Sequence, residues 1–444
     1  MRTTSRIIVF LFLLLGHVSC LANSHFVVVS TNKNGGHETV YTLDTTTAAP
    51  RSSTPLPPPP PPPSWRSQFR AVFLPTGPTP SGYLSFATLN ALQDLSTQLR
   101  GVLATQRILE GLGVGRADAT ATSAILNFLV RDGCGMFATL LFTATAASKF
   151  AADVKRWRLL ADIMVDVGIT LEILAAQVPP RFFLLLLSLG NMCKAVCGVA
   201  AGACGGTINL HWASCGSDIA DIQAKFGAQH AVTASVGLMV AALTTQSLAH
   251  VPMRQLWSGY WILTVLHIWI NRKCMRMMAF TSLNTVRLRL LLKHYRNESH
   301  QSLPTPQQMA QTEPLLFLPT RHTVPPIEYG ISFHHVAHKM GHEEEALRQI
   351  LEQATQSYWI FVAQPHCIMV VLQKGISPTD QAKAYFHATL LAQSLKDEKK
   401  DLEDREVEVQ WNKFANQCVQ AGWDLTKTEL QTHGYHIEIQ AARQ

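Results

Sequence analysis

Charged residues are scarce in this chain. Asp, Glu, Lys and Arg make up 15% of its 444 residues and hydrophobic residues make up 47%, whereas soluble proteins contain roughly 25% charged residues. Such a chain has too few charged side chains to cover its apolar surface in water. The length suffices for roughly two or three domains of ordinary size. This composition excludes a single small module and favours a protein associated with a membrane.

A strongly basic surface and the common catalytic motifs are also missing. The net charge is only +7, and no block of five or more basic residues occurs, so we expect no nucleic-acid partner. The sequence contains no GxGxxG before a helix, no GxxxxGK(S/T), no HExxH and no GxSxG. Because no pattern places a nucleophile beside a base, we expect neither enzymatic activity nor a cofactor.

The nine cysteines are odd in number, and several lie in apolar helical stretches, which argues against a disulfide scaffold. Cys193 and Cys197 share a helix face, and His334, His338 and His342 recur at every fourth position. Neither set is accompanied by the further ligands of a zinc site. Buried cysteines, surface histidines and no metal are therefore expected, with a metal site as the alternative for each set.

Residues 1–22 have the features of a signal peptide. Arg2 and Arg6 precede a short apolar run, Ile7–Leu15, and small residues follow. Residues 23–84 are rich in Ser, Thr and Pro, and their run of consecutive prolines predicts a disordered linker. We therefore expect entry into the secretory pathway, although the arginines among Ser and Thr also suit an organellar transit segment.

Residues 85–296 are dominated by apolar runs that are compatible with helices. Residues 182–216 contain one charged residue, Lys194, while 231–253 and 255–271 contain none. About 20 apolar residues cross the hydrocarbon core of a bilayer. The sequence therefore predicts a mainly α, membrane-embedded bundle, and a large soluble bundle with fully buried helices is the alternative.

Three glycines, Gly198, Gly202 and Gly206, repeat at every fourth position within the first of these runs. On a helix they lie on one face, where two backbones can approach closely. They predict a helix-packing face. The alternative is that the glycines at 205 and 206 end the helix.

Beyond a connector at residues 297–326, the sequence predicts a small soluble α+β module over residues 327–444. Helices are expected at 343–354, 378–395 and 404–421, and strands at 358–362, 367–372 and 435–439. Asn297 begins the only glycosylation sequon, which is usable if the connector is lumenal.

The densest polar cluster of the helical segment begins at Lys149 and runs through Asp153 and Lys155. At 100° per residue, several of its charges fall on one side of a helix. Charges among apolar helices are costly and usually functional, so we predict a ligand or ion path. Its candidate residues are Lys155, Arg156, Arg158, Asp162, Asp166, Lys194 and Lys225. Lys194 needs either an acidic partner, for which Asp162 or Asp166 is expected, or an aqueous path. The alternative is a solvated face with an i,i+4 ion pair between Arg158 and Asp162.

The span 93–284 resembles the root UVB sensitive (RUS) family. The resemblance is carried by Asp132–Gly135, Lys155–Arg158 with Asp162, Gly190–Asn191, Cys197–Gly202, Asn209 and Asp218–Gln229. It implies a helical RUS domain at residues 85–296 and a membrane-associated protein without established enzymatic activity. Plant members are linked to UV-B responses, vitamin B6 homoeostasis and auxin transport, often from plastids. A bipartite plastid leader would reconcile that location with the start of this chain.

Together these observations predict a non-catalytic transport, scaffold or regulatory component of a membrane. The expected partners are membrane lipids, with another RUS family protein or a small phosphorylated or anionic ligand as further candidates for the basic cluster. The alternative is a soluble or peripheral interaction module, in which the C-terminal part binds a protein partner.

Overall fold

The computed structural model describes residues 26–30, 39–43, 64–113, 120–249, 251–297, 302–315, 326–363, 367–397 and 404–439. The chain divides into two compact units, Met1–Trp65 and Arg66–Gln444. The predicted signal peptide at residues 1–22 and the proline run at 57–63 lie outside the described residues.

Short elements of secondary structure lie within the predicted linker. Strand β1 (Phe26–Ser30) pairs antiparallel with β2 (Thr39–Leu43), and helix α2 (Trp65–Phe73) follows. The segment predicted as a disordered linker, residues 23–84, therefore contains short elements of secondary structure at these positions. The reason is local: the two strands are rich in Val and Thr, which favour β structure, although the segment as a whole is rich in Ser, Thr and Pro.

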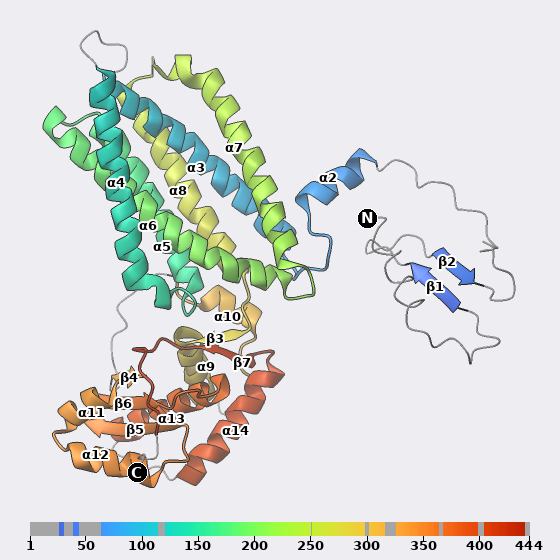
Figure 1. The fold of residues 1–444 in the computed structure, drawn as a ribbon, viewed down its shortest axis with the longest axis vertical. Helices are drawn as coiled ribbons and strands as arrows, with labels where there is room; N and C mark the ends of the chain where they lie inside the picture. Colours follow the sequence, from blue (N-terminus) through green and yellow to red (C-terminus); the bar gives the residue numbers. More distant parts are fainter. Residues whose placement is uncertain are drawn as a thin grey trace, which may run out of the picture. The chain divides into compact units, whose positions relative to one another are not determined.

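Helices α3 to α8 lie side by side and form the bundle (Figure 1). They are α3 (Tyr83–Gly111), α4 (Ala121–Ala146), α5 (Val154–Ala175), α6 (Pro180–Ala213), α7 (Ile219–Ala249) and α8 (Met253–Met277), with a short 3-10 helix, η1 (Ala147–Lys149), after α4. Thr120 caps α4 by accepting a hydrogen bond from the backbone N–H of Ser123. Helix α5 contacts α3, α6 and α8. The predicted mainly α bundle is confirmed.

A close approach of two helix backbones occurs at glycines other than the predicted ones. A Cβ atom on Gly168 of α5 would lie 2.7 Å from the carbonyl oxygen of Gly190 in α6, so only glycine fits this crossing. A Cβ atom on Gly198, Gly202 or Gly206 would meet no described atom within 4 Å. The prediction that these three glycines pack helices within the chain is wrong, because their face of α6 points away from the rest of the bundle.

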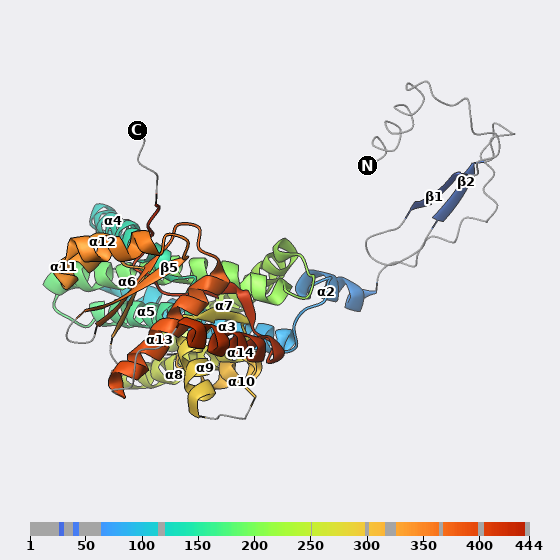
Figure 2. The ribbon, with the colours of Figure 1, turned by 90° about the horizontal axis from the view of Figure 1, so that it is seen from below.

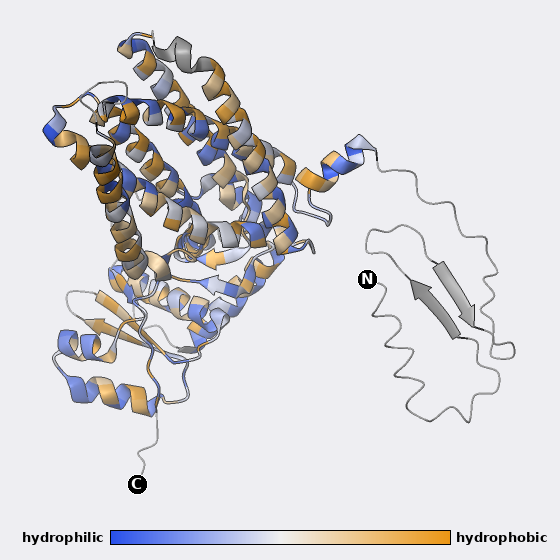
Figure 3. Cartoon of the chain, turned by 45° about the horizontal axis from the view of Figure 1, so that its top comes forward, coloured by the Kyte–Doolittle hydropathy of each residue, from blue (hydrophilic) through white to orange (hydrophobic). Residues whose placement is uncertain are grey.

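The outer surface of the bundle is apolar. Large hydrophobic side chains are exposed on α4, α6, α7 and α8, for example Leu140, Leu185, Leu238 and Ile262, and Figure 3 shows the hydrophobic stretches along the bundle helices. Among the described residues, α4, α6 and the Ile219–Leu243 part of α7 are long and apolar enough to cross a membrane.

These three helices match the predicted apolar runs only in part. Residues 182–216 correspond to α6 and residues 231–253 overlap α7, whereas residues 255–271 lie in α8, which is not among the three. Helix α4 was not predicted as a span, because Arg131 and Asp132 interrupt its apolar sequence.

The C-terminal module is built on a three-stranded sheet with the order β4 (Ile327–Tyr329), β6 (Cys367–Leu372), β5 (Tyr358–Ala363). Alternate residues of β6 face opposite cores: Ile368 and Val370 join one, while Met369 and Val371 join the other. One face is covered by α11 (Phe333–Met340) and α12 (Glu343–Glu352), and the other by α13 (Pro378–Lys396) and α14 (Asp404–Gln420) (Figure 2). The predicted α+β module is confirmed.

Two sequence boundaries need correction. Strand β3 (Ser282–Asn284) pairs in parallel with β7 (Asp424–Glu429), and α9 (Thr285–Asn297) packs its leucines into the module core. The segment after residue 281 therefore belongs structurally to the module, and the connector contains α10 (Pro306–Thr312). The strand predicted at 435–439 is reduced to one bridge between Gln373 and Ile437, since β7 supplies the last strand.

Candidate functional site

Polar side chains from three helices meet in the middle of the bundle. Helix α3 contributes Gln93 and Arg100, α5 contributes Asp162 and Asp166, and α8 contributes His267 and Asn271; none is more than 5% exposed. Within each helix the two residues are separated by four or seven positions, so they lie on one face. We call these six residues the central network.

Two ion pairs balance the charges of the central network. Arg100 donates through Nη1 to the carboxylate of Asp166. Arg158, also on α5, donates to the carboxylate of Asp162. The alternative of a solvated charged face is wrong for the two aspartates, because α3 and α8 cover the side of α5 that carries them. Opposite charges attract more strongly in such an interior than in water.

Gln93 and His267 join the two ion pairs. His267 Nδ1 lies 3.0 Å from the Asp166 carboxylate, and His267 Nε2 lies 3.3 Å from Gln93 Nε2. Gln93 and Asn271 also donate to Asp162. Since a carboxylate only accepts and an amide nitrogen only donates, these contacts fit His267 donating through Nδ1–H and accepting through Nε2. Hydrogen bonds thus connect Asp166 continuously to Asp162.

Protonation of His267 would rearrange this connection. A proton on Nε2 would face the N–H groups of the Gln93 amide, so two donors would meet. The amide of Gln93 would have to rotate and present its oxygen, which would remove its hydrogen bond to Asp162.

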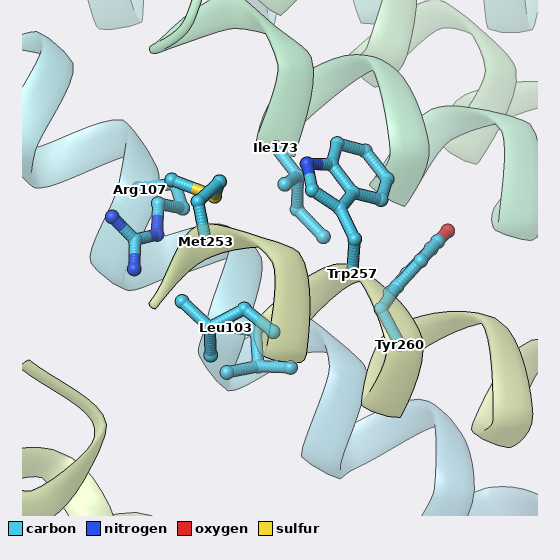
Figure 4. Close-up of a pocket in the computed structure, with 7 residues that line it drawn as sticks. Leu103, Arg107, Ile173, Met253, Trp257 and Tyr260 are labelled. Atoms are coloured by element: carbon cyan, nitrogen blue, oxygen red, sulfur yellow. The ribbon is translucent and has the colours of Figure 1, made fainter. Parts of the chain in front are cut away.

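A small pocket lies beside one end of the central network. It has a volume of about 10 Å³ and is lined by Leu103, Arg107, Ile173, Met253, Leu256, Trp257 and Tyr260 (Figure 4). In Figure 4, Trp257 and Tyr260 project from the same helix, α8. The Tyr260 hydroxyl donates to the backbone carbonyl of Asp166 at 3.0 Å. Tyr260 thereby connects the pocket to the central network.

The remaining residues of the predicted path lie elsewhere. Lys194 Nζ lies 2.5 Å from Glu172 Oε1, so the prediction that it pairs with Asp162 or Asp166 is wrong. Glu172 lies on the side of α5 that contacts α6, whereas the two aspartates face α3 and α8. Lys225 pairs with Asp221 on α7 at 3.2 Å.

Lys155 and Arg156 lie where the bundle meets the module. Lys155 Nζ is 3.0 Å from one carboxylate oxygen of Glu313, and Arg287 Nε is 3.2 Å from the other. Asp153 lies 3.8 Å from Arg156 and accepts hydrogen bonds from Asn284 and Gln431. We call Asp153, Lys155, Arg287 and Glu313 the interface cluster; all four side chains are buried.

Burial and charge oppose each other in the interface cluster. Burial by itself raises the pKa of a carboxyl group. For Glu313, the nearby Arg287 and Lys155 outweigh burial and hold the pKa below its ordinary value. For Asp153, burial outweighs the attraction of Arg156, so the pKa is raised. Glu313 is therefore the carboxylate whose charge this cluster stabilises.

Four residues of the central network were missed by sequence reasoning: Gln93, Arg100, His267 and Asn271. A signal existed in the sequence, because each pair is spaced by four or seven positions within a helix that is otherwise largely apolar. The helices that carry them are not adjacent in sequence, and periodicity alone does not say which helix faces meet.

The three histidines His334, His338 and His342 do not lie on one continuous helix in the structure. Helix α11 ends at Gly341, which has a φ of 72°, so His342 does not continue the face of His334 and His338. Within the described ranges, no three His, Cys, Asp or Glu side chains are grouped so that they could hold a metal ion. Asn297 is the last residue of α9, and the remainder of its sequon lies outside the described residues.

These features define a class of protein: a helical bundle with three helices able to cross a membrane, a buried ionic interior and an α+β module. Residues 62–299 match the family described as "Vitamin B6 photo-protection and homoeostasis domain", and residues 302–410 match "Root UVB sensitive protein, C-terminal". The chain belongs to the root UVB sensitive family, as the sequence motifs predicted.

Named relatives occur in a plant and an amoeba. The chain is 30% identical over 349 residues to "Protein root UVB sensitive 3" of Arabidopsis thaliana, covering 74% of this chain and 76% of the relative. It is 29% identical to "RUS family member 1" of Dictyostelium discoideum over 55% of this chain and 47% of the relative. It is also 29% identical to "Protein root UVB sensitive 2, chloroplastic" of A. thaliana over 55% of each chain. No solved structure matches the chain.

Proposed function

We propose that this chain is an integral membrane protein that carries a small anionic solute together with a proton, and that it acts in vitamin B6 homoeostasis without catalysing a reaction. The observation that carries the proposal is the central network, in which two buried ion pairs are linked inside a bundle with an apolar exterior. Ionisable groups in such a setting usually mark substrate or ion pathways. The vitamin B6 connection is supported by the description of the matched domain.

The dimensions of the bundle suit a bilayer. The shortest of its helices, α5, has 22 residues, which corresponds to about 33 Å and exceeds the roughly 30 Å of the hydrocarbon core. The buried aspartates of α5, Asp162 and Asp166, face α3 and α8, while its residue Val167 is exposed. Helices that carry charges can therefore span the membrane with α4, α6 and α7, because their polar groups are turned inward.

Protonation of His267 supplies the proposed coupling. With neutral His267, Arg100 and Arg158 are balanced by Asp166 and Asp162. A proton adds one positive charge and weakens the contact between Gln93 and Asp162, so the protonated network favours an anion such as a phosphorylated vitamer. Loss of the proton restores the balanced state and favours release.

The test uses the full chain in two steps. Membranes from expressing cells are first washed with alkaline carbonate, and the chain should stay in the pellet. The purified protein is then reconstituted into liposomes, and uptake of labelled pyridoxal phosphate and pyridoxine is measured with and without an inward proton gradient. We expect uptake of the phosphorylated compound that rises with the gradient.

Two histidine variants sharpen this test. His267→Gln keeps hydrogen-bonding groups but cannot be protonated near neutral pH, so proton-dependent uptake should be lost. His230→Gln is the matched control, since His230 is 58% exposed in its side chain and pairs with Asp94 outside the central network. Equal uptake by both variants, or release of the protein by carbonate, would contradict the proposal.

A second candidate function, a protein interaction module, is favoured by the outer side of the C-terminal module. Leu347 and Leu351 of α12 and Val362 of β5 are exposed. Truncation at residue 343 is a poor test, because it removes β7, the partner of β3. The double variant Leu347→Ser, Leu351→Ser should abolish partner binding and leave solute uptake unchanged if both functions exist.

A further inference from the structure

Two hollows follow one another along the outer face of α8. The first lies between α8 and the start of α3, has a volume of about 550 Å³ and is lined by Leu84, Ser85, Thr88, Leu89, Lys273 and Met277. The second has a volume of about 470 Å³ and is lined by Trp261, Ile262, Val265, Leu266 and Trp269. We call the first the head groove and the second the tail hollow.

The two hollows share one face of α8. Ile262, Val265, Trp269 and Lys273 are separated by three or four positions, which places them in one row on a helix. Lys273 Nζ lies 5.3 Å from the centre of the Trp269 ring, so the head groove and the tail hollow meet at this pair. The side chains of Ile262, Val265 and Trp269 are 68%, 67% and 55% exposed. The row therefore has a cationic end and an apolar remainder.

The cationic end has no acidic counterpart. Helix α8 and residues 83–93 of α3 contain no Asp or Glu, whereas Arg272, Lys273 and Arg276 lie in the last two turns of α8. None of the residues that line the head groove is acidic. Ser85 adds a hydroxyl to the lining, and a hydroxyl can donate to a phosphate oxygen. By charge complementarity, the occupant of the head groove carries a negative charge.

The position of Lys273 along α8 matches the level of lipid headgroups. Gln311 of α10 donates to the backbone carbonyl of Arg276 at 3.2 Å, so the last turn of α8 lies where the bundle meets the module. Residues 255–271, which precede this end, contain no charged residue. Tryptophan is enriched at the surfaces of membranes, and lysine extends its ammonium group toward water there. Trp269 beside Lys273 fits this boundary.

The length of the row selects among anions. Lys273 and Ile262 are separated by about three helical turns, which corresponds to about 16 Å. One leaflet contributes half of the hydrocarbon core, or about 15 Å. A free phosphate ion would occupy the head groove alone and leave the apolar row uncovered. An anion that carries an acyl chain covers both hollows.

We propose that the two hollows bind a phospholipid of net negative charge from the leaflet on the module side, with its phosphate at Lys273 and Ser85 and one acyl chain along the tail hollow. A zwitterionic lipid brings its own cation toward Lys273 and therefore gains less from the site. The inference rests on the proposed function, which places the bundle in a membrane. Because α8 carries His267 and Asn271 on its buried face, the lipid would contact the helix that supplies two residues of the central network.

The experiment uses the full chain in liposomes that contain photoreactive phosphatidylglycerol or phosphatidylcholine, each with the same diazirine and alkyne in one acyl chain. Labelled peptides are identified by mass spectrometry. A peptide of α4 around Leu140 is the internal reference, because this residue is exposed on another helix. Relative to that reference, we expect the peptide that contains residues 261–269 to be labelled about fivefold more by the anionic lipid, which is the contribution of one cation near an anionic headgroup.

Three variants distinguish a built site from the general attraction of anionic lipids to basic residues. Lys273→Gln should abolish the preference for the anionic lipid, and Lys273→Arg should retain it because the charge is kept. Arg272→Gln is the matched control: it removes the same charge at the neighbouring position, which lines neither hollow, and should retain the preference. Both residues are exposed, so we expect all three variants to fold, and carbonate retention checks this.

The outcomes separate this inference from the proposed function. Equal labelling by the two lipids in protein that stays in the membrane overturns the lipid site and leaves the transport proposal standing. An equal loss of preference in Lys273→Gln and Arg272→Gln also overturns the site, because surface charge in general would then explain the labelling. Release by carbonate overturns the membrane location and the lipid site with it. A preference that only Lys273→Gln removes supports the lipid site.

Discussion

The bundle and the C-terminal module differ in the residues that they expose and in the charges that they bury. The bundle holds Arg100, Asp162 and Asp166 inside and exposes leucines such as Leu140, whereas the module buries Val370 and Phe414 and exposes ion pairs such as Glu344 with Arg348. The module follows the rule for a protein in water. The bundle has apolar cores as well, but it departs from the rule by exposing large hydrophobic side chains and burying charges. This is expected when the surroundings are as apolar as the side chains.

The largest effect is expected when a charge is removed from inside the bundle. Arg100→Met leaves Asp166 buried without its cation, which should lower the free energy of unfolding by about 3 to 5 kcal/mol. Thermal unfolding in detergent measures the change. The double variant Arg100→Met, Asp166→Leu should recover part of the loss. If the single and double variants are equally unstable, the loss of stability in Arg100→Met does not come from leaving Asp166 without its ion-pair partner.

A charge placed on the outside of the bundle should be the next most harmful. Leu140→Arg puts a cation on the exposed face of α4, which should make membrane insertion less favourable by about 2.5 to 3.5 kcal/mol. The fraction retained after a carbonate wash measures this effect. Leu347→Arg on the module is the control, and it should leave retention unchanged. Equal retention of both variants would contradict the idea that the bundle surface faces lipid while the module surface faces water.

The interface cluster, where the two regions meet, should show an intermediate effect with a defined pH dependence. Glu313→Gln leaves Lys155 and Arg287 without their carboxylate and should destabilise by about 2 kcal/mol near neutral pH. Because the pKa of Glu313 is below its ordinary value of 4.5 in the folded chain, its contribution is present above pH 4.5 and is lost as the pH falls below it.

The sign of this effect can be checked by unfolding between pH 3 and 7. The unmodified chain should lose stability toward acid in the window below pH 4.5, and Glu313→Gln should lose less there. Asp153 acts in the opposite direction, because its raised pKa favours the protonated form. If the variant loses stability toward acid as steeply as the unmodified chain, other carboxyl groups and not Glu313 cause the acid destabilisation.

The smallest effect is expected on the surface of the module. Arg348→Ala removes an ion pair whose side chains are 71% and 81% exposed, so the free energy of unfolding should change by no more than about 0.5 kcal/mol. Chemical denaturation provides the measurement. A loss comparable to that of Arg100→Met would show that exposure does not separate the two kinds of ion pair.

Periodicity and composition predicted much of the secondary structure. The helices near 343, 378 and 404 and the strands near 358 and 367 lie where their patterns predicted them. Strand β7 was missed, because all residues of Asp424–Glu429 except Leu425 are polar and show no apolar alternation. The strand is stabilised by pairing with β3, which lies far earlier in the chain. Local patterns carry no information about such a partner.

The candidate site could be predicted only on one helix. Asp162 and Asp166 were predicted as site residues because they are charges in an apolar sequence, and both lie in the central network. Their partners Arg100 and His267 could not be assigned, since they come from α3 and α8. The expected partner of Lys194 was wrong for the same reason: helical periodicity places a residue on a face without naming the helix opposite.

The sequence by itself determined that the chain forms long apolar helices followed by an α+β module, because hydrophobic periodicity and charge content act locally. Tertiary structure decided that the charges of α5 face inward, that Gly168 and Gly190 form the close helix crossing, and that β3 and α9 join the module. Each of these depends on which surfaces pack together. Helix packing brings together residues up to about 170 positions apart, such as Gln93 and His267, and no single segment encodes that meeting.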